Sequence, residues 1–66
     1  MNVTVNGQRR TIAPGTRLAE LLDGEHVPAR GTAAAVDGEV VPRSNWTQFL
    51  LHEGQAVELL TAVQGG

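Results

Sequence analysis

The chain has 66 residues and a mass of 7.0 kDa, which is enough for one small domain and leaves no room for a second. Its 5 basic and 7 acidic residues give a net charge of −2, which argues against a nucleic-acid binder, because such proteins usually present a basic surface. The sequence has no cysteine, so it can form neither a disulfide, a thiolate nucleophile nor a cysteine-ligated metal site.

The first residues predict a β-hairpin. Val3 and Val5 alternate with polar residues, and Asn6-Gly7 is the strongest short signal for a hairpin turn. Residues 8–12 would form the returning strand, which Pro14-Gly15 ends.

A short helix is expected next. Leu18, Leu21 and Leu22 have helical spacing, Thr16 is a suitable N-cap, and Gly24 can end the helix. The leucines would pack on the valines of the hairpin, because a helix of roughly two turns does not persist alone.

The middle of the chain predicts a loop and a second hairpin. Residues 24–31 lack a clear period and contain glycine and proline, which is typical of a loop. Residues 33–36 form a buried strand in this interpretation, Asp37-Gly38 a turn, and residues 39–41 the returning strand. Pro42 then fits at the end or edge of that strand.

The last third predicts a tight turn and one or two strands. Ser44 can cap a turn through residues 45–47, and residues 49–51 could add a brief strand. Residues 56–63 are rich in β-branched and apolar side chains and indicate a final strand. The order of elements predicts an α+β fold, with one short helix gripped by a mixed sheet of four to five strands. The valine-rich first and last strands would lie side by side in its middle.

Residues with catalytic chemistry are few and scattered. Ser44 suits a turn cap better than a nucleophile, and His26 and His52 are interpreted as surface histidines without metal-ligand spacing. The carboxylates at 20, 23 and 25 suit the solvent-facing side of the helix. We therefore expect no catalytic residues and no metal site.

Two aromatic residues and one arginine admit two interpretations. Trp46 and Phe49 are expected to close one end of the core, and a role in contacting a partner is the alternative. Arg43 is either simply exposed or binds a carboxylate or phosphate of a partner.

The chain ends in Gln64, Gly65 and Gly66. Such an end can be an ordinary frayed terminus. Alternatively, a carboxylate behind two residues without a Cβ can enter a narrow channel, react with ATP and accept a nucleophile as an acyl adenylate. The protein would then be a carried substrate, and its partners would supply the catalytic groups.

The final strand also suggests a docking strip. If residues 57, 59, 61 and 63 face the helix, Leu60 and Ala62 point outward and leave apolar side chains beside the tail. We expect Leu60, Ala62 and Val63 to contact a partner, although single exposed apolar residues are normal on any strand.

Three segments carry a resemblance to a known family. Residues 3–6, the stretch Asp-Gly-Glu-Val-Val-Pro-Arg-Ser-Asn-Trp at 37–46, and Thr-Ala-Val-Gln-Gly-Gly at 61–66 resemble the sulfur carrier proteins of thiamine biosynthesis. The likeness covers essentially the whole chain. It implies the β-grasp (ubiquitin-like) fold, with a domain at residues 1–62 and a flexible tail at 63–66.

The resemblance also implies a cycle. An E1-like adenylating enzyme would activate Gly66 with ATP and magnesium, and a cysteine-derived sulfur donor system would convert it to a thiocarboxylate. Thiazole synthase would then take the sulfur into the thiazole moiety of thiamine. The protein would be a cytoplasmic carrier, not an enzyme, that binds no cofactor, nucleic acid or membrane itself.

Three other functions remain open on the sequence. The small subunit of molybdopterin synthase uses the same chemistry on the same fold but is usually longer. A ubiquitin-like protein modifier would be joined to targets through Gly66. A pure binding module would carry its Gly-Gly end incidentally.

Overall fold

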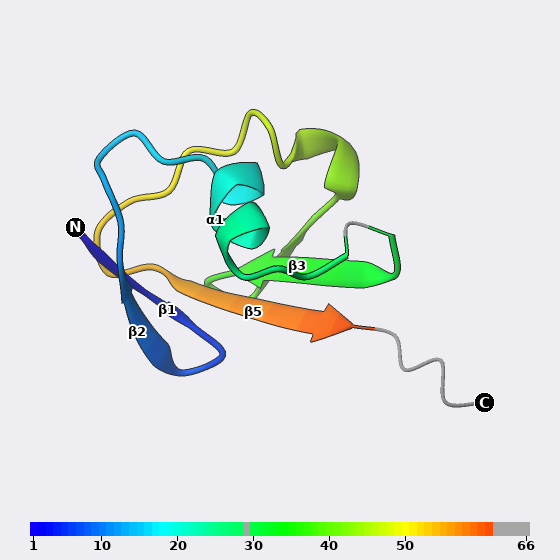
Figure 1. Cartoon of the computed structure of the whole chain (residues 1–66), viewed down its shortest axis with the longest axis horizontal. Coiled ribbons are helices and arrows are strands. Elements are labelled where there is room, and N and C mark those ends of the chain that lie inside the picture. Colours follow the sequence, from blue (N-terminus) through cyan, green and yellow to red (C-terminus); the bar gives the residue numbers. More distant parts are fainter. Residues whose placement is uncertain (29, 62–66) are drawn as a thin grey trace.

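The structure, a computed structural model, describes residues 1–28 and 30–61. Strands β1 (Asn2–Val5) and β2 (Gln8–Thr11) form the first hairpin (Figure 1). Asn6 and Gly7 both have positive φ, at 50° and 83°, as the favoured two-residue turn requires. The predicted hairpin is confirmed, with the second strand ending at Thr11.

Helix α1 (Leu18–Gly24) buries Leu18, Leu21 and Leu22 as the sequence predicts. The predicted cap at Thr16 is wrong, because the N-cap is Arg17. The Thr16 hydroxyl instead donates to the Ala13 carbonyl at 2.6 Å. The Glu20 carboxylate accepts a hydrogen bond from the Arg17 N–H at 2.8 Å and supplies one half of a capping box.

The start of α1 is also held by a distant segment. The Leu18 N–H donates to the Phe49 carbonyl at 2.8 Å, and the Ala19 N–H donates to the Trp46 carbonyl at 3.0 Å. These bonds satisfy amides that a helix cannot pair internally. A helix of seven residues thus depends on tertiary contacts.

Strands β3 (Thr32–Val36) and β4 (Glu39–Val41) form the second predicted hairpin. Asp37 and Gly38 form its turn with φ of 51° and 86°. Pro42 follows the edge strand β4, where a missing N–H costs no ladder bond.

Two smaller predictions in the next segment are wrong. Ser44 lies inside the 3-10 helix η1 (Arg43–Asn45), whose N-cap is Pro42, so it does not cap a turn. Residues 49–51 form only a single bridge, between Leu50 and Arg17. The Leu51 N–H donates to the Thr16 carbonyl at 3.0 Å, so this segment pairs with the lead-in to α1 rather than with the sheet.

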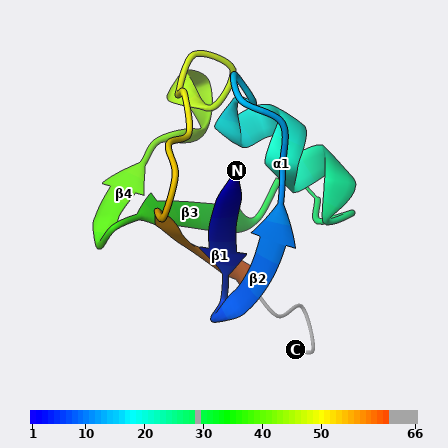
Figure 2. The same cartoon turned by 90° about the vertical axis from the view of Figure 1, so that its left-hand side faces the viewer.

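Strand β5 (Ala56–Thr61) completes a five-stranded sheet in the order β2-β1-β5-β3-β4. It runs parallel to β1 and antiparallel to β3, so the sheet is mixed and β5 is central. The predicted pairing of first and last strands is therefore confirmed. Figures 1 and 2 show α1 against the concave face of the curled sheet, as the α+β prediction requires.

The core lies between α1 and the sheet. Trp46 is only 5% exposed, and its indole Nε1 donates to the Val41 carbonyl at 2.8 Å. Phe49 is half-buried and packs against the core, so the expectation that both aromatics close it is confirmed. The predicted boundary between residues 62 and 63 lies outside the described residues. Within those residues, no helix is long and apolar enough to cross a membrane.

Candidate functional site

Strand β5 presents opposite faces to the core and to the outside. Val57 is fully buried and Leu59 is half-buried against the core, whereas Leu60 is 75% exposed. Thr61 is exposed on the helix-facing side, where it lines a groove with Leu59. The orientation predicted for these residues is confirmed, because side chains alternate along a strand.

One of the predicted site residues lies in this strand, and the others come after it in the sequence. Leu60 is the one that falls inside the described residues, on the outer face of the sheet. The predicted docking residues Ala62 and Val63 and the predicted tail residues Gln64, Gly65 and Gly66 lie outside the described residues.

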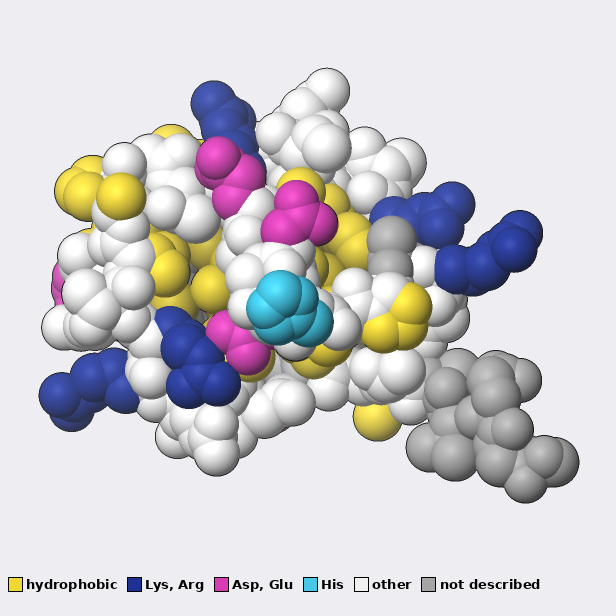
Figure 3. Space-filling model, viewed as in Figure 1, with side chains coloured by type: hydrophobic (Ala, Val, Ile, Leu, Met, Phe, Trp, Pro, Cys, Tyr) yellow, Lys and Arg dark blue, Asp and Glu magenta, His cyan; other side chains and the backbone are white. Residues whose placement is uncertain are grey.

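Leu60 belongs to an apolar surface that we call the outer-face patch. Leu60 pairs with Ala33 of β3, and Ala35 of β3 pairs with Val40 of β4, which is 73% exposed. These side chains line a shallow hollow of about 200 Å³. Glu58, opposite Ala35, also lines this hollow and places a carboxylate beside it. Figure 3 shows hydrophobic atoms projecting at the lower border of the molecule, below the end of β5.

Sequence reasoning found only Leu60 of this patch. A signal for Val40 was present, because the Asp37-Gly38 turn fixes the register that places Val40 opposite Ala35. The alanines at 33–35 gave no such signal, because three identical residues in a row do not show which side chain of β3 faces outward.

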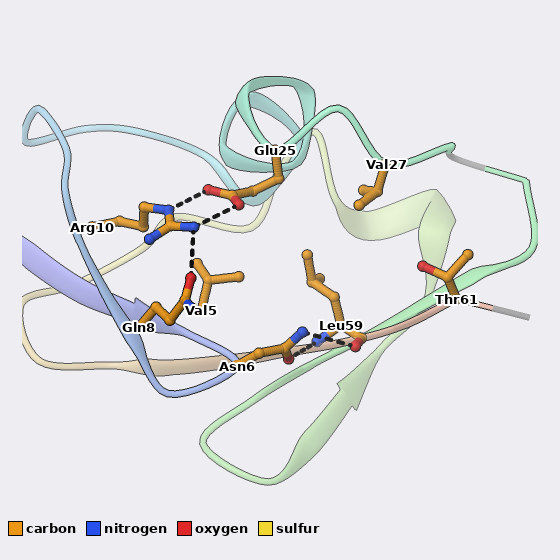
Figure 4. A pocket seen from close by; sticks show the side chains of 8 residues that line it. All are labelled: Val5, Asn6, Gln8, Arg10, Glu25, Val27, Leu59 and Thr61. Carbon is orange, nitrogen blue, oxygen red and sulfur yellow. Dashed lines mark hydrogen bonds and ion pairs between the residues drawn. The ribbon is translucent and has the colours of Figure 1, made fainter.

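Both hairpin turns hold β5 through a side chain (Figure 4 shows the first). Asn6 Oδ1 accepts a hydrogen bond from the Leu59 N–H at 2.8 Å, and Asn6 Nδ2 donates to the Leu59 carbonyl at 3.3 Å. Asp37 Oδ1 accepts from the Ala56 N–H at 2.9 Å. One contact lies at the start of β5 and the other lies two residues before its end.

A groove of about 280 Å³ runs beside Asn6 on the helix-facing side (Figure 4). Arg10 Nε donates to Glu25 Oε2 at 2.8 Å, and a terminal guanidinium nitrogen donates to Oε1 at 3.2 Å. This bidentate pair joins β2 to the end of α1 and raises the pKa of Arg10, first through the hydrogen bond and then through the charge of Glu25. The interpretation of Glu25 as a solvent-facing helix residue is therefore wrong.

The remaining polar candidates stay apart. His26, His52 and Ser44 are exposed and lie on three separate segments. Among residues 1–28 and 30–61, no three His, Asp or Glu side chains come together as metal ligands would. Arg43 is exposed and lines a hollow of about 230 Å³ together with Trp46 and residues of α1.

Comparisons with known proteins cover the chain from end to end. The model of the ThiS family matches residues 3–66. The sulfur carrier protein ThiS of Escherichia coli (strain K12) is 30% identical over 66 residues, which are 100% of both chains. A thiazole synthase of Paramagnetospirillum magneticum is 27% identical over 66 residues, which are 100% of this chain and 20% of that protein.

Solved structures agree with the fold. The crystal structure of the thiamine biosynthesis protein ThiS from Geobacter metallireducens superposes with a TM-score of 0.84, 33% identity and 100% coverage of both chains. The solution structure of a thiamine biosynthesis protein from the same organism gives a TM-score of 0.82 at 35% identity, and covers 100% of this chain and 88% of that one. The mixed sheet around one helix is thus the β-grasp fold expected from the sequence.

Proposed function

Because the chain belongs to the ThiS family, and so is a sulfur carrier for the thiazole part of thiamine, we propose that the carboxyl group of Gly66 carries the sulfur. The observation that supports this most is the end-to-end match to a sulfur carrier, which includes the Gly-Gly end. The protein is not itself a catalyst, and other enzymes act on it. The family works with thiazole synthase, whereas the activating partner is part of our proposal.

The chemistry at Gly66 needs two steps. A carboxylate oxygen of Gly66 attacks the α-phosphorus of ATP on an E1-like adenylating enzyme, and pyrophosphate leaves with its magnesium. Sulfide-level sulfur derived from cysteine then attacks the acyl carbon, and AMP leaves, so that a C–S bond replaces the bond to the phosphate oxygen. Gly65 and Gly66, which follow Gln64, have no Cβ, so no side chain next to the reacting carboxyl group obstructs either step.

Deletion of Gly66 tests the reacting residue. The shortened chain should unfold at the same denaturant concentration as the parent, because the deletion removes none of the residues that form β5 or the core cluster. It should form no thiazole in a reaction reconstituted with the activating enzyme, a sulfur source and thiazole synthase. Undiminished thiazole formation by the shortened, folded chain would contradict the proposal.

We also assign the outer-face patch to the docking of thiazole synthase. The patch adjoins the end of β5, and its two large apolar side chains, Leu60 and Val40, are both exposed and line one hollow instead of lying singly on the surface. A segment related to this whole chain occurs within a thiazole synthase, so a carrier-like domain and that enzyme can share one polypeptide. Ala62 and Val63 would extend the contact toward the tail.

Leu60→Glu tests this assignment. A carboxylate placed in the centre of an apolar contact should weaken binding to thiazole synthase by roughly tenfold or more. The reason is that the carboxylate gives up its hydration on binding and finds no hydrogen-bond donor or positive charge in exchange. Leu50→Glu is the matched control, since Leu50 is 39% exposed and lies outside the patch. Equal affinities of the two variants, measured by titration calorimetry, would refute the assignment. Weaker binding only to the adenylating enzyme would move the patch to that partner.

The comparisons favour thiamine over the other open functions. The chain belongs to the ThiS family, and its relatives include a sulfur carrier protein ThiS and a thiamine biosynthesis protein ThiS. Neither molybdopterin synthesis, protein modification nor simple binding therefore needs to be invoked. A cytoplasmic location stays a prediction.

A further inference from the structure

Backbone pairing between β1 and β5 stops before β5 ends. Thr4 pairs with Ala56 and Val5 with Val57, and the Asn6 N–H donates to the Val57 carbonyl at 2.9 Å. The chain then turns toward β2 through Asn6 and Gly7, both with positive φ. The backbone of β1 therefore leads away from Leu59, the next residue of β5 that faces this edge.

The Asn6 side chain takes the place of the missing backbone. Its Oδ1 accepts from the Leu59 N–H at 2.8 Å and its Nδ2 donates to the Leu59 carbonyl at 3.3 Å (Figure 4). A side-chain amide offers the same acceptor and donor as a peptide group, so the ladder continues by one further step. Asparagine also tolerates the positive φ that the turn imposes, which few other residues do.

The two hydrogen bonds from the Asn6 side chain to Leu59 determine whether the end of β5 is held on both edges. On the other edge, β3 pairs with β5 up to Thr32 opposite Thr61. Asn6 supplies the matching contact on the β1 edge, only two residues before the strand ends. Without it, the last residues of β5 would be held from one edge only.

When an enzyme holds the C-terminal segment extended in its channel, a small change in strand direction at Leu59 becomes a large displacement at Gly66. Leu59 and Gly66 are seven Cα–Cα steps apart and so at most about 25 Å apart when that stretch is extended, and a swing of about 10° then displaces the far end by about 4 Å. A displacement of about 1 Å at a reacting group can already cost a factor of about a hundred in rate.

We propose that Asn6 is a positioning residue for the reactions at Gly66. By completing the hydrogen-bond ladder at Leu59, it sets the direction in which the C-terminal segment leaves the sheet and thereby the fraction of docked complexes in which Gly66 reaches the reacting phosphate. This inference rests on the proposed role of Gly66.

Asp37 offers a matched control within the same chain. It also opens a two-residue turn with positive φ, and its Oδ1 also accepts a hydrogen bond from β5, at the Ala56 N–H. That contact lies at the start of the strand, away from the C-terminal segment. Asn6→Gly and Asp37→Gly each remove one such contact, and glycine adopts both turn conformations without strain.

The test compares the two variants as substrates of the adenylating enzyme in ATP–pyrophosphate exchange. For Asn6→Gly we expect kcat to fall about fivefold or more while KM changes less than twofold, because docking persists and fewer docked complexes are productive. A purely structural loss would lower the folded fraction and raise the apparent KM instead. Asp37→Gly should keep the parental kcat. Asn6→Asp retains the acceptor for the Leu59 N–H, so its kcat should lie between those of the parent and of Asn6→Gly.

Amide hydrogen exchange supplies a readout that does not depend on chemistry. In Asn6→Gly the amides of Leu59 and Leu60 should exchange faster, and in Asp37→Gly only the amide of Ala56 should do so. Unchanged exchange at Leu59 and Leu60, or an equal fall of kcat in both glycine variants, would overturn the proposal. If the parent protein is never adenylated, the proposed role of Gly66 fails, and the exchange pattern alone decides whether Asn6 fixes the end of β5.

Discussion

At the scale of single residues, Leu59 and Leu60 show how one strand serves both the core and the surface. The two leucines are neighbours in β5, yet Leu59 packs on the core while Leu60 is 75% exposed. Their contribution to stability should therefore differ although their chemistry is the same.

Leu59→Ala should lower the free energy of unfolding by about 1–2 kcal/mol, below the ~2–5 kcal/mol typical of fully buried leucines, because Leu59 is only half-buried. Leu60→Ala should change it by less than about 0.5 kcal/mol. Urea denaturation of both variants measures the difference. A larger loss for Leu60→Ala would mean that the faces of β5 are exchanged, as a slip of one residue in register would produce.

The sequence predicts well which side chains of a strand face the core, but it predicts polar contacts between distant residues poorly. The alternation of residues in β5 is local, so it could be interpreted directly. Asn6 could be recognised only as a turn residue, because its side-chain partner Leu59 lies 53 positions away. The interpretation of Glu25 as solvent-facing is wrong for the same reason, since its partner Arg10 belongs to another element.

At the scale of elements, α1 shows why the helix itself is predictable and its start is not. The leucine spacing fixes the buried face whatever caps the helix. The position of the cap depends on which side chains are free to bond to the helix backbone. The Thr16 hydroxyl is already bonded to the Ala13 carbonyl. Residues 49–51 have the composition of a strand, but their partner is the segment before α1 rather than the sheet.

Glu20→Ala tests the observed cap. The substitution removes the acceptor of the Arg17 N–H and should lower the free energy of unfolding by about 1 kcal/mol. Asp23→Ala is the control on the same helix, because Asp23 is exposed, and it should change stability by less than about 0.5 kcal/mol. Thermal unfolding followed by circular dichroism separates the two. Equal losses would show that the capping bond contributes nothing specific.

At the scale of the whole molecule, the position of β5 connects the fold with its function. The strand that leads to the Gly-Gly end lies between β1 and β3 and is hydrogen-bonded on both edges. If Gly66 carries the sulfur, as we propose, a strand that is paired on both edges gives the segment before it a rigid support. The outer-face patch beside β5 is the surface that we propose for the docking of thiazole synthase.

Much of the overall fold can be predicted from the sequence, because the pattern of elements and the resemblance indicate the same fold. The two hairpins, the helix and the adjacency of β1 and β5 follow from turn signals and apolar spacing. The outer-face patch could be predicted only in part, since Val40 joins Leu60 through the pairing of three strands.

The most direct test of the central claim is the intact mass of the protein after incubation with the adenylating enzyme, ATP and a sulfur source, followed by a thiol-alkylating reagent. The chain has no cysteine, so an adduct reports sulfur that was added. Alkylation is needed because oxidation of Met1 adds nearly the same mass as replacing oxygen by sulfur. We expect one alkyl group per chain, located at Gly66 by fragmentation. A chain that stays unalkylated, while a known carrier is alkylated by the same enzyme, would contradict the account.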